Sequence, residues 1–128
     1  MNAMRISDLA RAGGVGVETV RFYQRKGLLP KPRGAVQGAR HYGPEDARRL
    51  RFVRQAQAAG FSLAEIAELI DLDRTGDRAR ARTMARERIA ALDARIAQLA
   101  SARESLARLA AGCAKGDAGP CPILAAFD

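Results

Sequence analysis

The chain has 128 residues, of which 48% are hydrophobic and only 5% aromatic, and its formal net charge is +8. This length allows one compact domain and one long accessory element, and the basic excess favours a polyanionic partner, with nucleic acid ahead of an anionic membrane surface. No apolar run reaches the roughly 18 residues of a membrane span, and no acid–base pair, nucleophile–histidine set or phosphate-binding loop indicates an enzyme.

The N-terminal end shows no signal peptide, and the native start is either Met1 or Met4. Two cysteines in a chain without an export signal predict reduced thiols and a cytoplasmic protein. The first helix is expected to have Ser7 as its N-cap and to end at the glycine pair 13–14.

A second helix is predicted from about Val17 to Lys26, and Gly27 ends it. Two short helices joined by a glycine-bearing turn indicate a helix-turn-helix, whose second helix meets DNA. Arg21 and Arg25 lie four residues apart and therefore share one face of this helix. The residues at its N-terminal end are placed to meet base edges.

The segment after this helix predicts a small β-wing. Pro30 to Gly38 contains two prolines and two glycines and is expected to be a loop, and the extended segment that follows points Arg40 and Tyr42 to the same side. The predicted DNA-contacting residues are Val17, Glu18, Thr19, Arg21, Tyr23, Arg25, Lys26, Arg40 and Tyr42. The alternative is a solvated basic face with Tyr23 in the core.

Two more short helices are predicted before a charged segment. The third runs from Gly43-Pro44 to about Ala59, and the fourth follows a capping box of Ser62 and Glu65. The segment 73–82 is expected to be a linker or a loose helix start. The apolar residues that predict the core are Leu50, Val53, Ala56, Ile66, Leu69, Ile70 and Leu72.

The longest helix is predicted at 83–112, since neither glycine nor proline interrupts 83–111. It carries an apolar stripe with heptad spacing, formed by Ile89, Leu92, Ile96, Leu99 and Leu106. Arg103 occupies the one stripe position between Leu99 and Leu106 that is not apolar. A single apolar stripe on so long a helix needs a partner, and no other segment is long enough to supply it. We therefore expect a homodimer; the alternative is packing against the chain's own N-terminal domain.

The tail holds both cysteines, Cys113 and Cys121, separated by seven residues. Pro122 and the apolar residues after it can form a helical turn, which would make Cys121 an N-cap. The helix dipole favours a thiolate at that position. The pair indicates a metal site; the alternatives are a redox switch that forms a disulfide and two incidental thiols.

The segments VETVRFYQRKGLL, Arg40-x-Tyr42 and RQAQAAGFSLAEIAELI resemble the N-terminal domain of the MerR (mercury-resistance regulator) family of transcription regulators, and the resemblance extends to the tail. It implies a mainly α fold with a winged helix-turn-helix, a long antiparallel coiled-coil dimerisation helix and a short C-terminal metal-binding loop. It also implies that Arg21, Tyr23, Arg40 and Tyr42 contact double-stranded promoter DNA. The dimer would share this promoter with RNA polymerase, and effector binding would distort the DNA.

The corresponding domains are a DNA-binding domain at 4–72, a linker at 73–82, a dimerisation helix at 83–112 and an effector loop and tail at 113–128. The cysteine spacing and the sequence Cys-Pro-Ile resemble the copper-efflux branch of the family, which binds Cu(I), Ag(I) or Au(I) between two thiolates. Two soft ligands fit such an ion, whereas tetrahedral zinc requires about four ligands. Cu(I) is the expected ion, and Ag(I), Au(I) and Hg(II) are the alternatives.

One position departs from the family pattern. Zinc-, lead- and mercury-type members place a third cysteine at the start of the dimer helix and copper-type members a serine, whereas this chain has Arg78 there. We interpret Arg78 as a candidate to balance the negative charge of a monovalent ion held by two thiolates. Two rival functions within regulators are a Hg(II)- or redox-responsive member and a sensor of organic compounds or oxidants. A rival of another class is a thiol metal-buffering protein.

Overall fold

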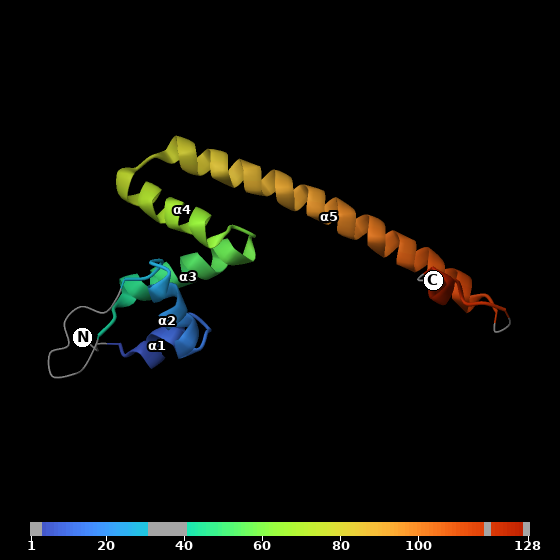
Figure 1. Ribbon diagram of the computed structural model, residues 1–128, viewed down its shortest axis with the longest axis horizontal. Coiled ribbons are helices and arrows are strands. Elements are labelled where there is room, and N and C mark those ends of the chain that lie inside the picture. The colour runs from blue at the N-terminus through green and yellow to red at the C-terminus, as the bar shows by residue number, and fades with distance from the viewer. Residues whose placement is uncertain (1–3, 31–40, 117–118, 127–128) are drawn as a thin grey trace. The chain divides into compact units, whose positions relative to one another are not determined.

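The computed structural model describes residues 4–30, 41–116 and 119–126. They form the α-helices shown in Figure 1 and one isolated antiparallel β-bridge between Met4 and Tyr42. The chain divides into two compact units, Met1–Arg88 and Ile89–Asp128. The predicted mainly α fold is confirmed. The helices are α1 (Ile6–Ala12), α2 (Val17–Arg25), α3 (Pro44–Ala58), α4 (Leu63–Thr75), α5 (Arg78–Ala114) and α6 (Pro122–Ala125).

The core of the first unit is built from one face each of α1, α2, α3 and α4. Leu50 and Val53 lie three residues apart on α3, and both are completely buried. Ile66 of α4 is also completely buried, and the partly buried Phe61 packs against the same core. The predicted core positions on α3 and the start of α4 are confirmed, whereas Leu69, Ile70 and Leu72 are only half-buried.

The predicted N-cap Ser7 is wrong, because Arg5, two residues earlier, is the N-cap and α1 begins at Ile6. The carboxylate of Asp8, at the third helical position, accepts a hydrogen bond of 3.0 Å from the Arg5 amide. A carboxylate in the first turn compensates the unpaired amides and the positive end of the helix dipole. Ser7 is therefore an exposed residue inside the helix.

Gly13 ends α1 where α3 crosses it. The Arg54 guanidinium of α3 donates a hydrogen bond of 2.7 Å to the Gly13 carbonyl. A Cβ atom at Gly13 would overlap the side chain of Leu50. The backbone angle φ of Gly13 is −90°, which any residue can adopt. The glycine is therefore required for the packing of α3 and not for the turn itself.

We expect Gly13→Ala to lower the free energy of unfolding by about 1–3 kcal/mol, because the added methyl group has no space beside the buried Leu50. Urea denaturation would measure the change. Gly16→Ser is the matched control, since no atom lies within 4 Å of the added Cβ there. An unchanged unfolding midpoint in Gly13→Ala would contradict this packing.

The junction between α4 and α5 is shorter than the predicted linker. Of the segment 73–82, only Gly76 and Asp77 lie outside a helix. Gly76 adopts φ +74°, a left-handed conformation that ends α4, and the Asp77 carboxylate then accepts a hydrogen bond of 3.1 Å from the Arg80 amide as the cap of α5. Alanine and arginine favour helix, so α5 begins at Arg78.

The capping box at the start of α4 is confirmed. The Ser62 amide donates to the Glu65 carboxylate at 2.8 Å, and the Glu65 amide donates to the Ser62 hydroxyl at 3.1 Å. The hydrogen bond from the Ser62 backbone is the main reason why the pKa of the Glu65 carboxyl lies below its ordinary value. Both orphan amides at this helix start are therefore satisfied.

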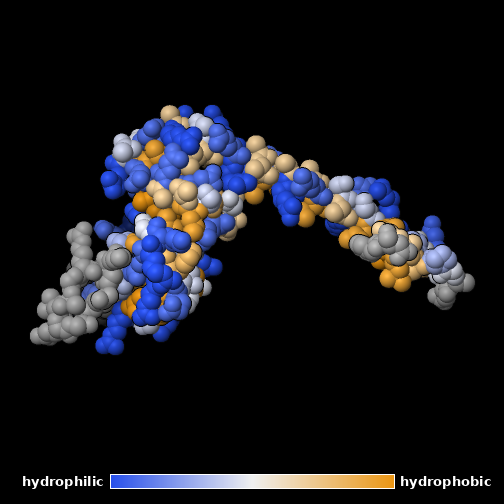
Figure 2. Space-filling view, viewed as in Figure 1, coloured by the Kyte–Doolittle hydropathy of each residue, from blue (hydrophilic) through white to orange (hydrophobic). Residues whose placement is uncertain are grey.

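The second unit consists of the remainder of α5 and the tail with α6. The predicted heptad stripe is exposed along α5, with Ile96 at 62% exposure and Leu99 at 55% (Figure 2). Isolated exposed leucines are ordinary on a protein surface, but a continuous apolar stripe indicates a partner surface. None of the described helices is both long enough and apolar enough to cross a membrane.

Candidate functional site

The solvent-facing side of α2 is basic. Arg21, Arg25 and Lys26 are exposed, whereas Val20 on the opposite face is completely buried and fixes the helix on the core. The Arg21 guanidinium forms an ion pair of 2.9 Å with the exposed Glu18 carboxylate. The structure therefore places the predicted arginines and the lysine where a phosphate backbone can reach them.

Val17 and Thr19 are half-buried in the first turn of α2, beside the exposed Glu18. Gly16 is the N-cap of this helix, with an extended backbone and open space around the position of a Cβ. The first turn is therefore unobstructed within the described residues, and its side chains lie at the end of the helix that enters a groove in helix-turn-helix proteins.

The rings of both predicted DNA-contacting tyrosines are buried, and for Tyr23 this agrees with the alternative that it belongs to the core. Tyr23 is 5% exposed and Tyr42 is 6% exposed. The Tyr23 hydroxyl donates to the side-chain oxygen of Gln57, and the Tyr42 hydroxyl accepts a hydrogen bond of 2.9 Å from Gln24. A buried tyrosine combines an apolar ring with a hydroxyl that finds a hydrogen-bond partner, so these two residues anchor α2 and the extended segment on the core.

The predicted wing is described only at its ends. Arg40 lies outside the described residues, as does most of the segment between Pro30 and Gly38. Tyr42 pairs with Met4 through two backbone hydrogen bonds of 2.8 and 3.1 Å. The sequence did not reveal this pairing, because no local pattern links two single residues so far apart in the chain.

The two cysteines come together between α5 and α6. Cys113 lies in the last turn of α5, Cys121 is the N-cap of α6, and their Sγ atoms are 3.0 Å apart. This distance exceeds the roughly 2.05 Å of a disulfide and corresponds to a hydrogen bond between the two sulfurs. That bond raises the pKa of Cys113 and lowers the pKa of Cys121, and the backbone N–H of Leu124 lowers the pKa of Cys121 further.

The donor set suits a low-coordinate soft ion. Both thiols are half-buried and lie close enough to bind the same ion. Within the described residues there is no group of three or more histidine, cysteine, aspartate or glutamate side chains that could hold a metal. A thiolate pair without such neighbours favours soft metals over zinc, calcium or magnesium.

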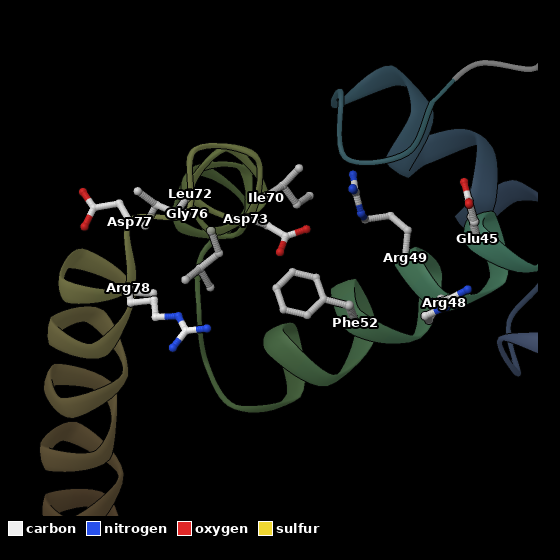
Figure 3. A pocket seen from close by; sticks show the side chains of 12 residues that line it. Glu45, Arg48, Arg49, Phe52, Ile70, Leu72, Asp73, Gly76, Asp77 and Arg78 are labelled. Atoms are coloured by element: carbon white, nitrogen blue, oxygen red, sulfur yellow. The ribbon is translucent and has the colours of Figure 1, made fainter.

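Arg78 lies at the opposite end of the 37-residue α5 from Cys113. It lines a cavity of about 870 Å³ formed by α3, α4 and the start of α5, together with Phe52, Leu72 and Asp73 (Figure 3). Arg78 and the cysteines therefore do not form one site within a single chain.

Sequence reasoning missed two glutamines that hold the buried tyrosines. Gln57 accepts a hydrogen bond from the Tyr23 hydroxyl, and Gln24 donates one to the Tyr42 hydroxyl. In the sequence, Gln24 stands out only by following Tyr23 on an amphipathic helix. That position does not predict a hydrogen bond with Tyr42, which lies on another segment.

Two family descriptions match the chain. The description "MerR HTH family regulatory protein" matches residues 4–73, and "MerR, DNA binding" matches residues 47–109. The mercuric resistance operon regulatory protein of Serratia marcescens is 41% identical over 125 residues, which cover 97% of this chain and 87% of that protein. The HTH-type transcriptional regulator CueR of Salmonella typhimurium is 36% identical over 123 residues, which cover 94% and 89%.

The fold is also found in solved structures. A transcription regulator of Ralstonia metallidurans in complex with lead(II) superimposes with a TM-score of 0.73 at 28% identity, covering 98% of this chain and 99% of that chain. The matches extend over the helix-turn-helix, the long helix and the cysteine-containing tail alike. The chain therefore belongs to the MerR family of DNA-binding transcription regulators.

Proposed function

We propose that this regulator acts as a homodimer and responds to a soft ion held between Cys113 and Cys121, with Cu(I) preferred and Ag(I) and Au(I) as related effectors. The observation that carries this proposal is the pair of Sγ atoms 3.0 Å apart without a third ligand nearby in the described residues. Thiolates prefer soft ions, and two ligands satisfy a monovalent ion better than they satisfy zinc. The seven-residue spacing, typical of the copper-efflux branch, supports the same ion.

Hg(II) is the second candidate effector. The mercuric resistance relatives are 41% identical to this chain and the CueR relatives 36%. Two thiolates and Hg(II) form a neutral group, whereas two thiolates and Cu(I) carry one negative charge. Arg78 of the partner subunit, brought near the tail by an antiparallel dimer, would balance that charge and so favour the monovalent ion.

A transcriptional reporter titrated with each ion separates the candidates. The promoter would first be recovered by selecting random DNA duplexes on the purified chain. We expect activation by Cu(I) and Ag(I), and we expect Arg78→Ser to weaken the response to Cu(I) without weakening the response to Hg(II). Activation by Hg(II) alone would establish the second candidate, and activation by Zn(II) alone would contradict a two-thiolate site.

We infer that α2 reads the promoter. The residues of its first turn, Val17, Glu18 and Thr19, would approach base edges, and Arg21, Arg25 and Lys26 would contact phosphates. Arg40 would contact phosphates from the wing, and the hydroxyls of Tyr23 and Tyr42 would donate to phosphates at the edge of the core. A protein that only buffers metals through its thiols would leave this exposed basic helix without a role, and failure to retain any promoter DNA in a gel-shift assay would support that alternative.

We expect Arg21→Ala to weaken operator binding and to reduce the salt dependence of the affinity by about one unit of slope for each protomer. The removed guanidinium is exposed and would exchange its Glu18 partner for a phosphate on binding. Arg108→Ala is the matched control, since Arg108 also forms an exposed ion pair with a glutamate but lies on α5. Equal salt slopes for Arg21→Ala and the unaltered chain would remove Arg21 from the interface.

We infer that the described stripe of α5 pairs with the same stripe of a second copy, in the antiparallel arrangement that the family resemblance implies. The two readers of the dimer would then bind a palindromic promoter that is shared with RNA polymerase in the cytoplasm. Binding of the effector at the tails would shift the dimer from one conformation to another, and the bound promoter would be distorted with it.

A further inference from the structure

Three residues spaced four apart at the start of α5 are held in place there: two arginines bind α4 and the turn before it, and the methionine between them is buried. The Arg80 guanidinium forms two hydrogen bonds with the Glu68 carboxylate of α4, at 2.7 and 3.2 Å. Met84 is only 3% exposed. The Arg88 guanidinium donates a hydrogen bond of 2.8 Å to the carbonyl of Gly60. Residues spaced by four lie on one face of a helix, so these three form a single docked face.

The last of these contacts is made on the turn between α3 and α4. Gly60 adopts φ +94°, and a Cβ atom there would meet the Arg88 guanidinium carbon at 3.3 Å. The guanidinium therefore lies against the glycine backbone, and its Nε atom is buried without a hydrogen-bond partner among the described residues. A methionine would occupy the same space without an unsatisfied donor, so the fold alone does not require arginine here.

The docked face ends where the exposed stripe begins. Arg88 is the last residue of the first unit, and Ile89 is the first residue of the second unit and of the heptad stripe. α5 thus presents one face to the DNA-binding unit and then, from the next residue, another face for a partner. The contact between Arg88 and Gly60 lies at this change of face.

We propose that Arg88 is a positioning residue that fixes the DNA-binding unit on the dimer helix. The two copies of α2 in a dimer would thereby be held at the spacing of two half-sites. The proposal rests on the dimeric DNA-binding function proposed above. A dimer binds a palindromic site more tightly than a single half-site only if both copies of α2 can occupy their half-sites at the same time. Loss of the hydrogen bond between Arg88 and Gly60 would allow each DNA-binding unit to rotate on α5. The affinity for the full palindrome would then fall.

The test compares the affinities of Arg88→Met for a selected full palindromic duplex and for a duplex with one half-site. We expect about tenfold weaker binding to the full site and unchanged binding to the half-site. The preference for the native half-site spacing, measured with duplexes lengthened or shortened between the half-sites, should also weaken. Arg86→Met, which removes the same charge from an exposed position two residues away, should change neither affinity.

A further variant guards against a simple folding defect. Arg88→Lys keeps the charge and one donor and should recover part of the full-site affinity. Equal losses on full and half-sites, or no loss on either, would overturn the positioning role. An unaltered chain that sediments as a monomer would overturn the proposed dimer instead, and this proposal with it.

Discussion

Replacing either Cys113 or Cys121 by serine should abolish the metal-dependent change in transcription while leaving operator binding intact. The two sulfurs form the whole donor set that the described residues offer, so each substitution removes half of it. A serine hydroxyl stays protonated at neutral pH and is a hard ligand that soft ions bind poorly. We expect the affinity for Cu(I) to fall at least about a hundredfold in each variant.

The design separates the metal site from the DNA-binding unit. Ala114→Ser is the matched control, because it adds the same hydroxyl to the last turn of α5 next to Cys113 without removing a thiol. Metal affinity would be measured by competition with a chromophoric chelator, and operator affinity by fluorescence anisotropy. Full induction by Cu(I) in either cysteine variant would contradict the two-thiolate site.

The same variants test the redox alternative. A switch that works through a disulfide between Cys113 and Cys121 would also be lost in both variants, but it would respond to oxidant and be silenced by dithiothreitol. We expect the unaltered chain to respond to Cu(I) under anaerobic conditions, in which both thiols stay reduced without an added thiol that would compete for the ion. A response that appears only on oxidation, with loss of two free thiols, would assign the tail to redox sensing.

Ile96→Glu should convert the dimer to a monomer and remove high-affinity operator binding. Ile96 is 62% exposed in the single chain and lies in the middle of the apolar stripe of α5. Burying an isoleucine contributes about 2 kcal/mol, and a symmetric dimer contains two copies, so the dimer should weaken by about a thousandfold before the cost of burying the carboxylate is added.

Ala94→Glu provides the control for charge and helix propensity. It adds the same carboxylate two residues earlier on α5. That position lies on the opposite face of the helix from the apolar stripe. Analytical ultracentrifugation over a range of concentrations would measure the dimer dissociation constant of both variants. Dimers of equal stability in Ile96→Glu and the unaltered chain would show that the stripe is not the dimer interface.

The sequence alone determined the local elements of this protein. The capping box of Ser62 and Glu65, the apolar spacing of Leu50 and Val53 and the heptad spacing along α5 each act within a few residues. Hydrogen bonds and helical periodicity at that range are specified by neighbours in the chain. The pairing of two cysteines across a short glycine-containing loop was predictable for the same reason.

Only the tertiary structure decided which side of each element faces inward. Tyr23 and Tyr42 have the chemistry of phosphate contacts, but glutamines on other elements accept or donate to their hydroxyls and hold the rings in the core. Gly13 is required by a leucine of α3, and the Arg88 guanidinium donates to the carbonyl of the turn at Gly60. These contacts join residues far apart in the chain, and an amphipathic side chain is buried or exposed according to the partner that the folded chain brings to it.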